Sequence, residues 1–285
     1  MEATHDSRHI QELLALRTSQ KDPQGTAILG MGVFPGLTNL MAREALTQAP
    51  AADHLEILLR VGVVSGAGRS MCRHMMQHLQ SRPFYFEESQ LCHGDPMQRV
   101  PLTLSNGDVP PRHEGGDSIL VGFPESLMLH ESAATRNIVT ALSLKPEWMN
   151  GILRSAGWLV RRAPLVGRLV EAGMILGRSV LLRWLPASLE ITVVARSKAC
   201  LSPVARVDVR CGDGARCAAA AIAGGLELLM ERRPLPRGVF TPDELLSLHD
   251  LLPRIAHSSP GGRGCDLQWT TNGGANTQAA SETRT

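Results

Sequence analysis

Two alternating segments within residues 189–211, LEITVVARSKACLSPVARVDVRC, decide the fold class of this chain. From 189 to 196 and again from 205 to 211, apolar residues occupy every second position, with mostly polar residues between them. A period of two is typical of β-strands that bury one face and leave the other in water. The short connection around Ser202 and Pro203 predicts that these two half-buried strands pair antiparallel.

Strand and helix patterns alternate along the rest of the chain. Apolar segments bounded by Gly, Pro or Asp are expected as strands, and apolar residues at helical spacing predict helices. The expected strands lie at 26–33, 55–64 and 136–144, with short strands within 84–135, and the expected helices at about 10–17, 36–48, 70–80, 146–162, 165–185 and 215–231. The sequence Thr241-Pro242-Asp243-Glu244 is a capping box that begins a last helix.

These elements predict an α/β domain, α+β-like in its ordering, in which helices cover a mixed sheet. We assign residues 1–24 to a partly helical N-terminal segment and residues 25–257 to the domain. Residues 258–285 are rich in Gly, Ser, Thr and Asn, so we expect a disordered tail.

Composition excludes several classes of protein. The 285 residues carry a formal net charge of only +2, and aromatic residues make up 4%, which argues against a nucleic-acid partner. The six cysteines form no C-x-x-C pair, and their low density indicates a reducing compartment. The N-terminus lacks the pattern of a signal peptide, and no apolar run is long enough to span a membrane. We therefore expect a cytoplasmic protein.

Residues 151–187 carry six arginines and one glutamate around two tryptophans. Such amphipathic helices could lie on an anionic membrane surface, or they could turn their apolar stripes toward the core of their own domain. The expected stripes contain Trp148, Ile152, Ala156, Leu159 and Ala163 in the first helix and Leu165, Leu169, Gly173, Leu176, Val180 and Trp184 in the second. We favour core packing over peripheral membrane contact and expect weak binding to anionic vesicles.

Two further patterns give weak signals. Gly66-Ala67-Gly68 follows an expected strand, and Glu87 stands where a ribose-binding acid would, but Met71 occupies the position of the third glycine of a dinucleotide fingerprint. His74 and His78 are four residues apart on an expected helix, with Cys92 or His93 available as a third zinc ligand. Neither pattern is complete, and we assign no metal site.

The strongest motif joins a strand to a helix at residues 30–42, GMGVFPGLTNLMA. Gly32 and Gly36 permit close approach of a ligand to the backbone, and Pro35 stiffens the entry to the helix. The first helical turn offers free N–H groups, and Thr38 and Asn39 add polar side chains there. These five residues are our candidate binding site for a substrate or cofactor, and the alternative is a simple turn.

These motifs resemble the saccharopine dehydrogenase family. Gly32, Pro35, Gly36 and Asn39 match its G-x-x-P-G-x-x-N/H stretch, at which the dinucleotide-binding domain is followed by the second domain. The later similarities keep the family's order and lie at 62–68, at 83–85, at 215–229 and at 238–244. The resemblance covers about residues 26–255.

The resemblance implies an NAD(P)-dependent oxidoreductase with a small-molecule substrate. The resemblance implies that this chain is the substrate-side second domain with a remnant of the Rossmann domain, truncated and inactive alone. Because Met71 replaces the third glycine of the fingerprint, we expect no tight binding of NADH or NADPH by the chain alone. An exposed inter-domain face should make the chain self-associate into a homo-oligomer or leave it poorly soluble. Candidate acids and bases are Glu87, His93, His130 and Glu131. An amino-acid, polyamine or lipid-like substrate fits equally, and the alternative is a non-catalytic interaction or membrane-surface protein that keeps this domain.

Overall fold

A computed structural model provides the structure of this chain. It describes residues 7–19, 22–63, 65, 75–76, 78–79, 81–100, 118–133, 135–163, 166–181, 184–185, 187–197, 200–257 and 268–271. Of the helix expected at 70–80, residues 75–76 and 78–79 are described, and they are helical. The glycine pattern at 66–68 and Met71 lie outside the described residues.

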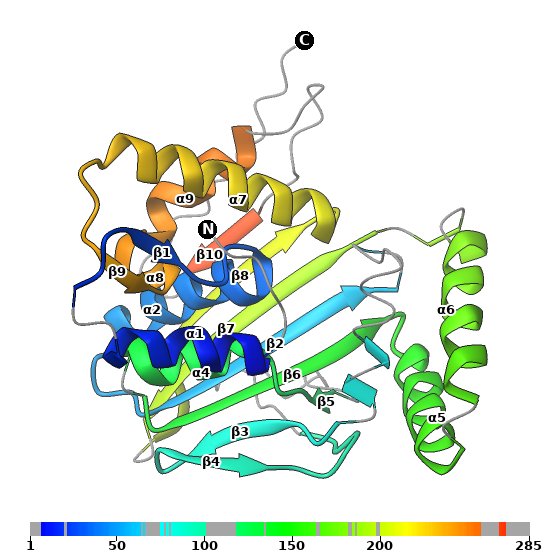
Figure 1. The fold of residues 1–285 in the computed structure, drawn as a ribbon. Coiled ribbons are helices and arrows are strands. Elements are labelled where there is room, and N and C mark those ends of the chain that lie inside the picture. The colour runs from blue at the N-terminus through cyan, green and yellow to red at the C-terminus, as the bar shows by residue number, and fades with distance from the viewer. Residues whose placement is uncertain are drawn as a thin grey trace.

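An eight-stranded mixed sheet forms the centre of the described fold (Figure 1). Strand β2 (His54–Gly62) pairs in parallel with β6 (Asn137–Lys145) and antiparallel with β7 (Leu189–Ser197). The order from one edge is β10 (Gln268–Thr271), β8 (Cys200–Cys211), β7, β2, β6, β3 (Phe84–Glu87) and β4 (Gln90–His93), and β5 (Ile119–Leu120) also pairs with β6. The mixed sheet and the antiparallel β7–β8 pair confirm the predicted fold class.

Helices cover one face of this sheet (Figure 1). The main covering helices are α2 (Thr38–Gln48), α4 (Pro124–Ala133), α7 (Gly214–Glu231) and α9 (Leu248–His257). The side chains of Ile57 and Ile191 point into this layer, where they pack in one cluster with Leu40 and Leu251. The one-turn helix α8 (Pro242–Leu245) begins with the predicted capping box, in which Thr241 and Glu244 satisfy each other's backbone N–H groups.

A second, two-stranded sheet lies on the helical side of the molecule. Strand β1 (Thr26–Ile28) pairs in parallel with β9 (Gly238–Phe240), more than 200 residues later in the chain. Helix α1 (Ser7–Ser19) packs against this pair through a small cluster in which Ile10 contacts Leu29, Met128 and Val239. The strand expected at 26–33 is therefore shorter than predicted, because the chain turns at Gly30.

Helix α4 corrects the expectation of short strands throughout residues 84–135. All six residues from Pro124 to Leu129 are buried, including Glu125 and Ser126. A helix that is buried on all sides shows no amphipathic period, so the pattern that reveals a surface helix is missing from its sequence. Pro124 at the first helical position was the available signal.

Strand β7 is buried on both faces, although alternation predicted a half-buried strand. Thr192, Val194 and Arg196 on its second face are less than a tenth exposed. Val194 packs with Leu58 and Val100 in a small apolar cluster on the face of the sheet opposite the helices. The sequence of β7 does not predict burial of its second face, because the residue that packs there, Val100, lies about a hundred residues earlier in the chain.

Helices α5 (Trp148–Arg162) and α6 (Gly167–Leu181) lie at one end of the sheet, apart from the main helical layer (Figure 1). The core-facing residues of α5 are Asn150, Leu153, Gly157 and Val160. The stripes that we expected to be buried face the solvent instead. Trp148 is 61% exposed and Leu169 is 72% exposed.

Strand β10 contradicts the expectation of disorder at Gln268–Thr271, within the predicted tail. It pairs antiparallel with β8, with Trp269 opposite Val209. The Trp269 side chain packs on the main core and meets the ring of His249 edge-on at 5.6 Å. Composition missed this strand because one aromatic residue and one free strand edge suffice to anchor a short segment.

We predict that Trp269→Ala destabilises the domain by about 1–3 kcal/mol, because it removes a large, partly buried ring from the core. Urea unfolding of the full chain measures this change. Trp184→Ala is the matched control, since Trp184 is 80% exposed and its removal should leave the unfolding midpoint unchanged. Equal midpoints for both variants would show that β10 adds nothing to stability.

Candidate functional site

The predicted motif forms a tight turn at the carboxyl end of β1. The segment Val33–Leu37 makes an irregular turn, named η1, that leads directly into α2. Gly36 has a φ of 128°, and a Cβ added there would lie 2.7 Å from the carbonyl oxygen of Gly30. Glycine is required at this position because both the backbone conformation and the available space exclude a side chain.

Asn39 holds the turn together from the first turn of α2. Its Oδ1 accepts a hydrogen bond from the Gly36 backbone N–H at 3.0 Å. The side chains of Thr38 and Asn39 are both completely buried, and Gly32, Pro35 and Gly36 are buried as well. The structure thus brings the five predicted residues together, but it directs their polar groups into the protein.

The residues of this turn do not fit a dinucleotide on their own. A glycine-rich cradle leaves space that the phosphates fill, whereas a Cβ at Gly30 would meet the side chains of Pro35 at 2.7 Å and Met128 at 2.8 Å. The space beside Gly30 and Gly36 is therefore filled by the protein itself. A nicotinamide cofactor would need to be held mainly by other residues.

We predict opposite effects for two neighbouring substitutions in this turn. Asn39→Ala should lower stability by about 1–2 kcal/mol, because it leaves the buried Gly36 N–H without an acceptor. Thr38→Val should be neutral or stabilising, because Thr38 Oγ1 has no hydrogen-bond partner among the described residues. Thermal unfolding of both variants tests this. A Thr38→Val protein as unstable as Asn39→Ala would show that the threonine hydroxyl has a partner of its own.

A half-buried aromatic group borders the same turn. Phe34, within the turn, stacks on Phe123 with the ring centroids 5.6 Å apart. The imidazole of His78 also contacts this group, edge-on to Phe123 with the ring centroids 4.8 Å apart. Phe34 and His78 are partly exposed, whereas Phe123 is buried. This arrangement places a titratable imidazole and flat apolar surfaces next to the carboxyl end of β1, where ligands of parallel sheets bind.

The sequence contains no local signal for this group. Its pattern indicates His78 only as a candidate zinc ligand and indicates no role for Phe34 or Phe123. These three residues come from separate segments of the chain, so no local spacing connects them. Within the described part of the chain, no group of three His, Cys, Asp or Glu side chains could hold a metal. His74 lies outside the described residues.

The four candidate acids and bases lie in different places. Glu87 and His93 are exposed at opposite ends of the β3–β4 hairpin, since Glu87 pairs with Gln90 and His93 with Phe84. His130 on α4 stacks on Phe86 with the ring centroids 4.1 Å apart, which gives it a packing role. Glu131 is exposed on the same helix. The structure does not bring these four residues into one site.

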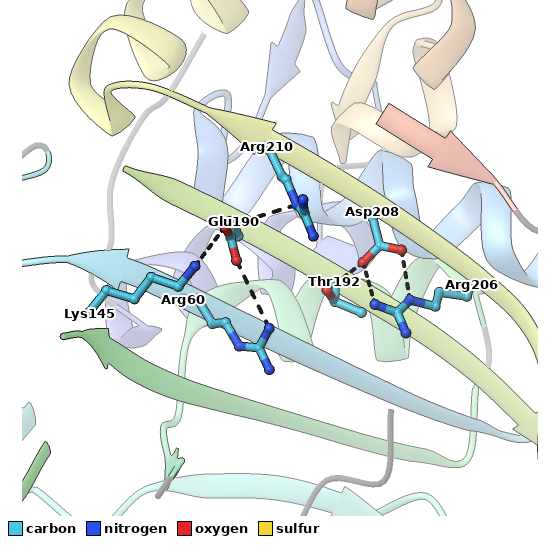
Figure 2. Close-up of polar contacts among 7 residues, drawn as sticks. All are labelled: Arg60, Lys145, Glu190, Thr192, Arg206, Asp208 and Arg210. Atoms are coloured by element: carbon cyan, nitrogen blue, oxygen red, sulfur yellow. Dashed lines mark hydrogen bonds and ion pairs between the residues drawn. The ribbon is translucent and has the colours of Figure 1, made fainter. Parts of the chain in front are cut away.

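The face of the sheet opposite the helices carries a network of charged side chains (Figure 2). Glu190 on β7 lies between Arg60 on β2 and Arg210 on β8, each 4.0 Å away, and its Oε1 is 2.6 Å from Lys145 Nζ at the end of β6. These residues share a face because they stand at alternate positions in matched register. One carboxylate thus faces three cations.

Two smaller clusters continue this charged face. Asp208 on β8 accepts hydrogen bonds from Thr192 at 2.6 Å and from Arg206 Nε at 2.7 Å. Further along, the carboxylate of Glu56 is 3.3 Å from Arg196 Nε. With the Glu190 network, the ion pairs among the described residues of this face join five cationic side chains to three carboxylates.

The charged face and the aromatic group are separate surfaces. Alternation in β2 and β7 sends the charged residues away from the helical layer, whereas the β1–α2 turn lies within that layer. A third surface is a depression of about 650 Å³ that includes Arg43, Asp53 and Arg136 in its lining. Its lining also contains residues from the carboxyl ends of α2 and α4, namely Leu46, Thr47 and Ala133.

Glu125 is the strongly perturbed acid of the helical layer. Its side chain is completely buried at the start of α4. Burial raises the pKa of this carboxyl to about 8, and interactions with the helix backbone and the Thr140 hydroxyl offset only part of the shift. Because the side chain is sealed inside the core, we assign it no contact with substrate.

The raised pKa of Glu125 predicts a pH-dependent stability. Below pH 4.5, the ordinary pKa, both the folded and unfolded states are protonated. From pH 4.5 to about 8 the unfolded state loses this proton and the folded state keeps it, so stability should fall by about 1.4 kcal/mol per pH unit.

Glu125→Gln should remove this contribution, because the amide does not ionise. Thermal unfolding of both proteins from pH 5 to pH 9 measures the difference. We expect the variant to gain stability over the unmodified protein as the pH rises. Parallel pH profiles would show that Glu125 ionises normally in the folded state.

No known protein-family description and no curated protein sequence matches this chain. Within the described ranges, no helix has both the length and the apolar character that are needed to cross a bilayer.

Proposed function

We propose that this chain is the substrate-side domain of an NAD(P)-dependent oxidoreductase of the saccharopine dehydrogenase type. The observation that carries the proposal is the parallel pair β1–β9, which no other described strand joins, with the turn and the aromatic group at its carboxyl end.

An isolated two-stranded parallel sheet is unusual. Parallel strands occur almost only in larger sheets that are covered on both faces, and two strands are rarely stable alone. β1 and β9 come from distant parts of the chain and run side by side, with α1 on one face. This geometry supports the interpretation that they belong to the edge of a larger parallel sheet, as in a Rossmann domain interrupted by a second domain.

The aromatic group supplies the chemistry that this domain would contribute. Phe34 is partly exposed and offers a flat apolar surface against which a planar ring can stack, and the buried Phe123 supports its ring from within. His78 is the residue that we assign to proton transfer, because an imidazole gains and loses a proton near neutral pH. The cofactor would be held by a companion dinucleotide-binding domain, since the turn itself does not fit one.

A domain-complementation experiment tests this proposal. The dinucleotide-binding domain of a saccharopine dehydrogenase would be fused ahead of the full chain, and NADPH binding would be followed by fluorescence. We expect no micromolar affinity in the chain alone, NADPH binding in the fusion, and NADPH-dependent turnover of one member of a panel of amino-acid, polyamine and lipid-like substrates.

Within the active fusion, His78→Gln should lower kcat by about a hundredfold or more, with NADPH affinity unchanged. The matched control is His257→Gln, because His257 is an exposed residue near the end of α9. A fusion that binds NADPH but turns over no substrate would overturn the proposed function. Equal activity of the two histidine variants would remove His78 from the mechanism.

A further inference from the structure

Large apolar side chains gather on the solvent side of α5 and α6, which we call the α5–α6 hairpin (residues 148–181). Trp158 is 51% exposed and Leu176 is 68% exposed, values that are unusual for such side chains in a folded domain. Trp148, Ile152, Leu159, Leu169 and Val180 are also among the exposed large apolar residues. The hairpin therefore leaves an apolar surface without cover.

Most of the exposed residues form one stripe on each helix. On α5, Trp148, Ile152 and Leu159 follow helical spacing on a side of the helix that lies about 100° around its axis from the buried residues Leu153 and Val160. α5 is thus apolar on two sides, and only one side reaches the core. The apolar stripe that the sequence predicts on this helix is present, but it faces the solvent and not the core.

The same arrangement occurs on α6. Leu169, Leu176 and Val180 lie on its outer face, whereas Val170 and Met174 pack on the small core cluster beneath the hairpin. A buried stripe and an exposed stripe therefore lie on different sides of this helix as well.

The glycines of α6 confirm that this face is open. A Cβ added at Gly173 or Gly177 would meet no atom within 4 Å, apart from its own helix. Gly173 continues the stripe between Leu169 and Leu176. No described part of this chain therefore covers the stripe.

Basic residues surround the apolar surface. Arg161, Arg162 and Arg168 are exposed near the connection between the two helices. The Arg162 guanidinium lies 4.4 Å from the ring centroid of Trp158, which is a cation–π contact. Over residues 151–187 the sequence contains six arginines and one glutamate.

We propose that the α5–α6 hairpin docks on an anionic membrane surface. Apolar stripes would enter the boundary between headgroups and acyl chains, tryptophans would lie at the headgroup level, and arginines would contact the lipid phosphates. This interpretation reverses the weak vesicle binding that we expected from the sequence, because that expectation required the stripes to face the core.

Charge favours a membrane over a second copy of this chain. A twofold dimer brings the same patch of both copies together. Here that contact would place arginines opposite arginines, with few carboxylates to balance them, and facing like charges cost several kcal/mol. An anionic lipid surface provides the complementary charge.

Vesicle cosedimentation of the full chain tests the proposal. Vesicles of phosphatidylcholine with about 30% phosphatidylserine would be compared with pure phosphatidylcholine. We expect binding to the anionic vesicles that weakens as NaCl rises from about 0.1 to about 0.5 M. Tryptophan fluorescence should shift to the blue on binding.

Three variants identify the surface. Arg161→Gln with Arg162→Gln should weaken binding by roughly thirtyfold, which corresponds to about 1 kcal/mol per basic residue. Leu169→Ser with Leu176→Ser should abolish the fluorescence shift. Gly173→Leu should strengthen binding severalfold, because it adds an apolar side chain to an open position on the stripe.

The control variants are Arg233→Gln and Leu226→Ser, which alter exposed residues elsewhere and should bind like the unmodified chain. All altered side chains are exposed, so the variants should fold, and circular dichroism checks this. Absence of anionic vesicle binding would overturn the proposal, as would hairpin variants that bind like the controls. A different result would assign the stripe to a second copy of this chain. In that case light scattering would show dimers that dissociate in the Leu169→Ser, Leu176→Ser variant, and the unmodified chain would not bind vesicles.

Discussion

The position of β2 between a parallel and an antiparallel neighbour is the constraint on which the rest of this structure depends. Its register with β6 and β7 places Leu55, Ile57 and Leu59 under the helices and sends Glu56 and Arg60 to the opposite face. A shift by one residue would exchange the two sets. The buried core and the charged face are therefore products of the same pairing.

The two faces of the sheet also carry different candidate functional surfaces. The helical side contains the β1–α2 turn, the isolated β1–β9 pair and the aromatic group around Phe123. The opposite side carries the network around Glu190 (Figure 2). Partly exposed ion pairs contribute little to stability, so this network is better understood as a surface of defined charge than as a source of folding energy.

Local physical chemistry explains which features could be predicted. Capping at Thr241, strict alternation in β8 and the glycine turn at Gly36 follow from backbone geometry, and the structure contains all three. Helix α4 was missed because burial on every side removes periodicity. The contact of Phe34 with Phe123 was missed because it joins segments almost ninety residues apart. The predicted site residues Thr38 and Asn39 do meet in one turn, but local sequence does not reveal whether a polar group faces a ligand or the core.

The sequence by itself determined the fold class, the antiparallel β7–β8 pair and the helical spacing of the α5 and α6 stripes. These properties depend on residues that are close in the chain, where side-chain period and backbone preference act directly. Only the tertiary structure decided that Trp148 and Leu169 face outward and that His78 lies against Phe123. An amphipathic helix has a defined apolar side, but what lies against that side is decided by elements far away in the chain, or outside it.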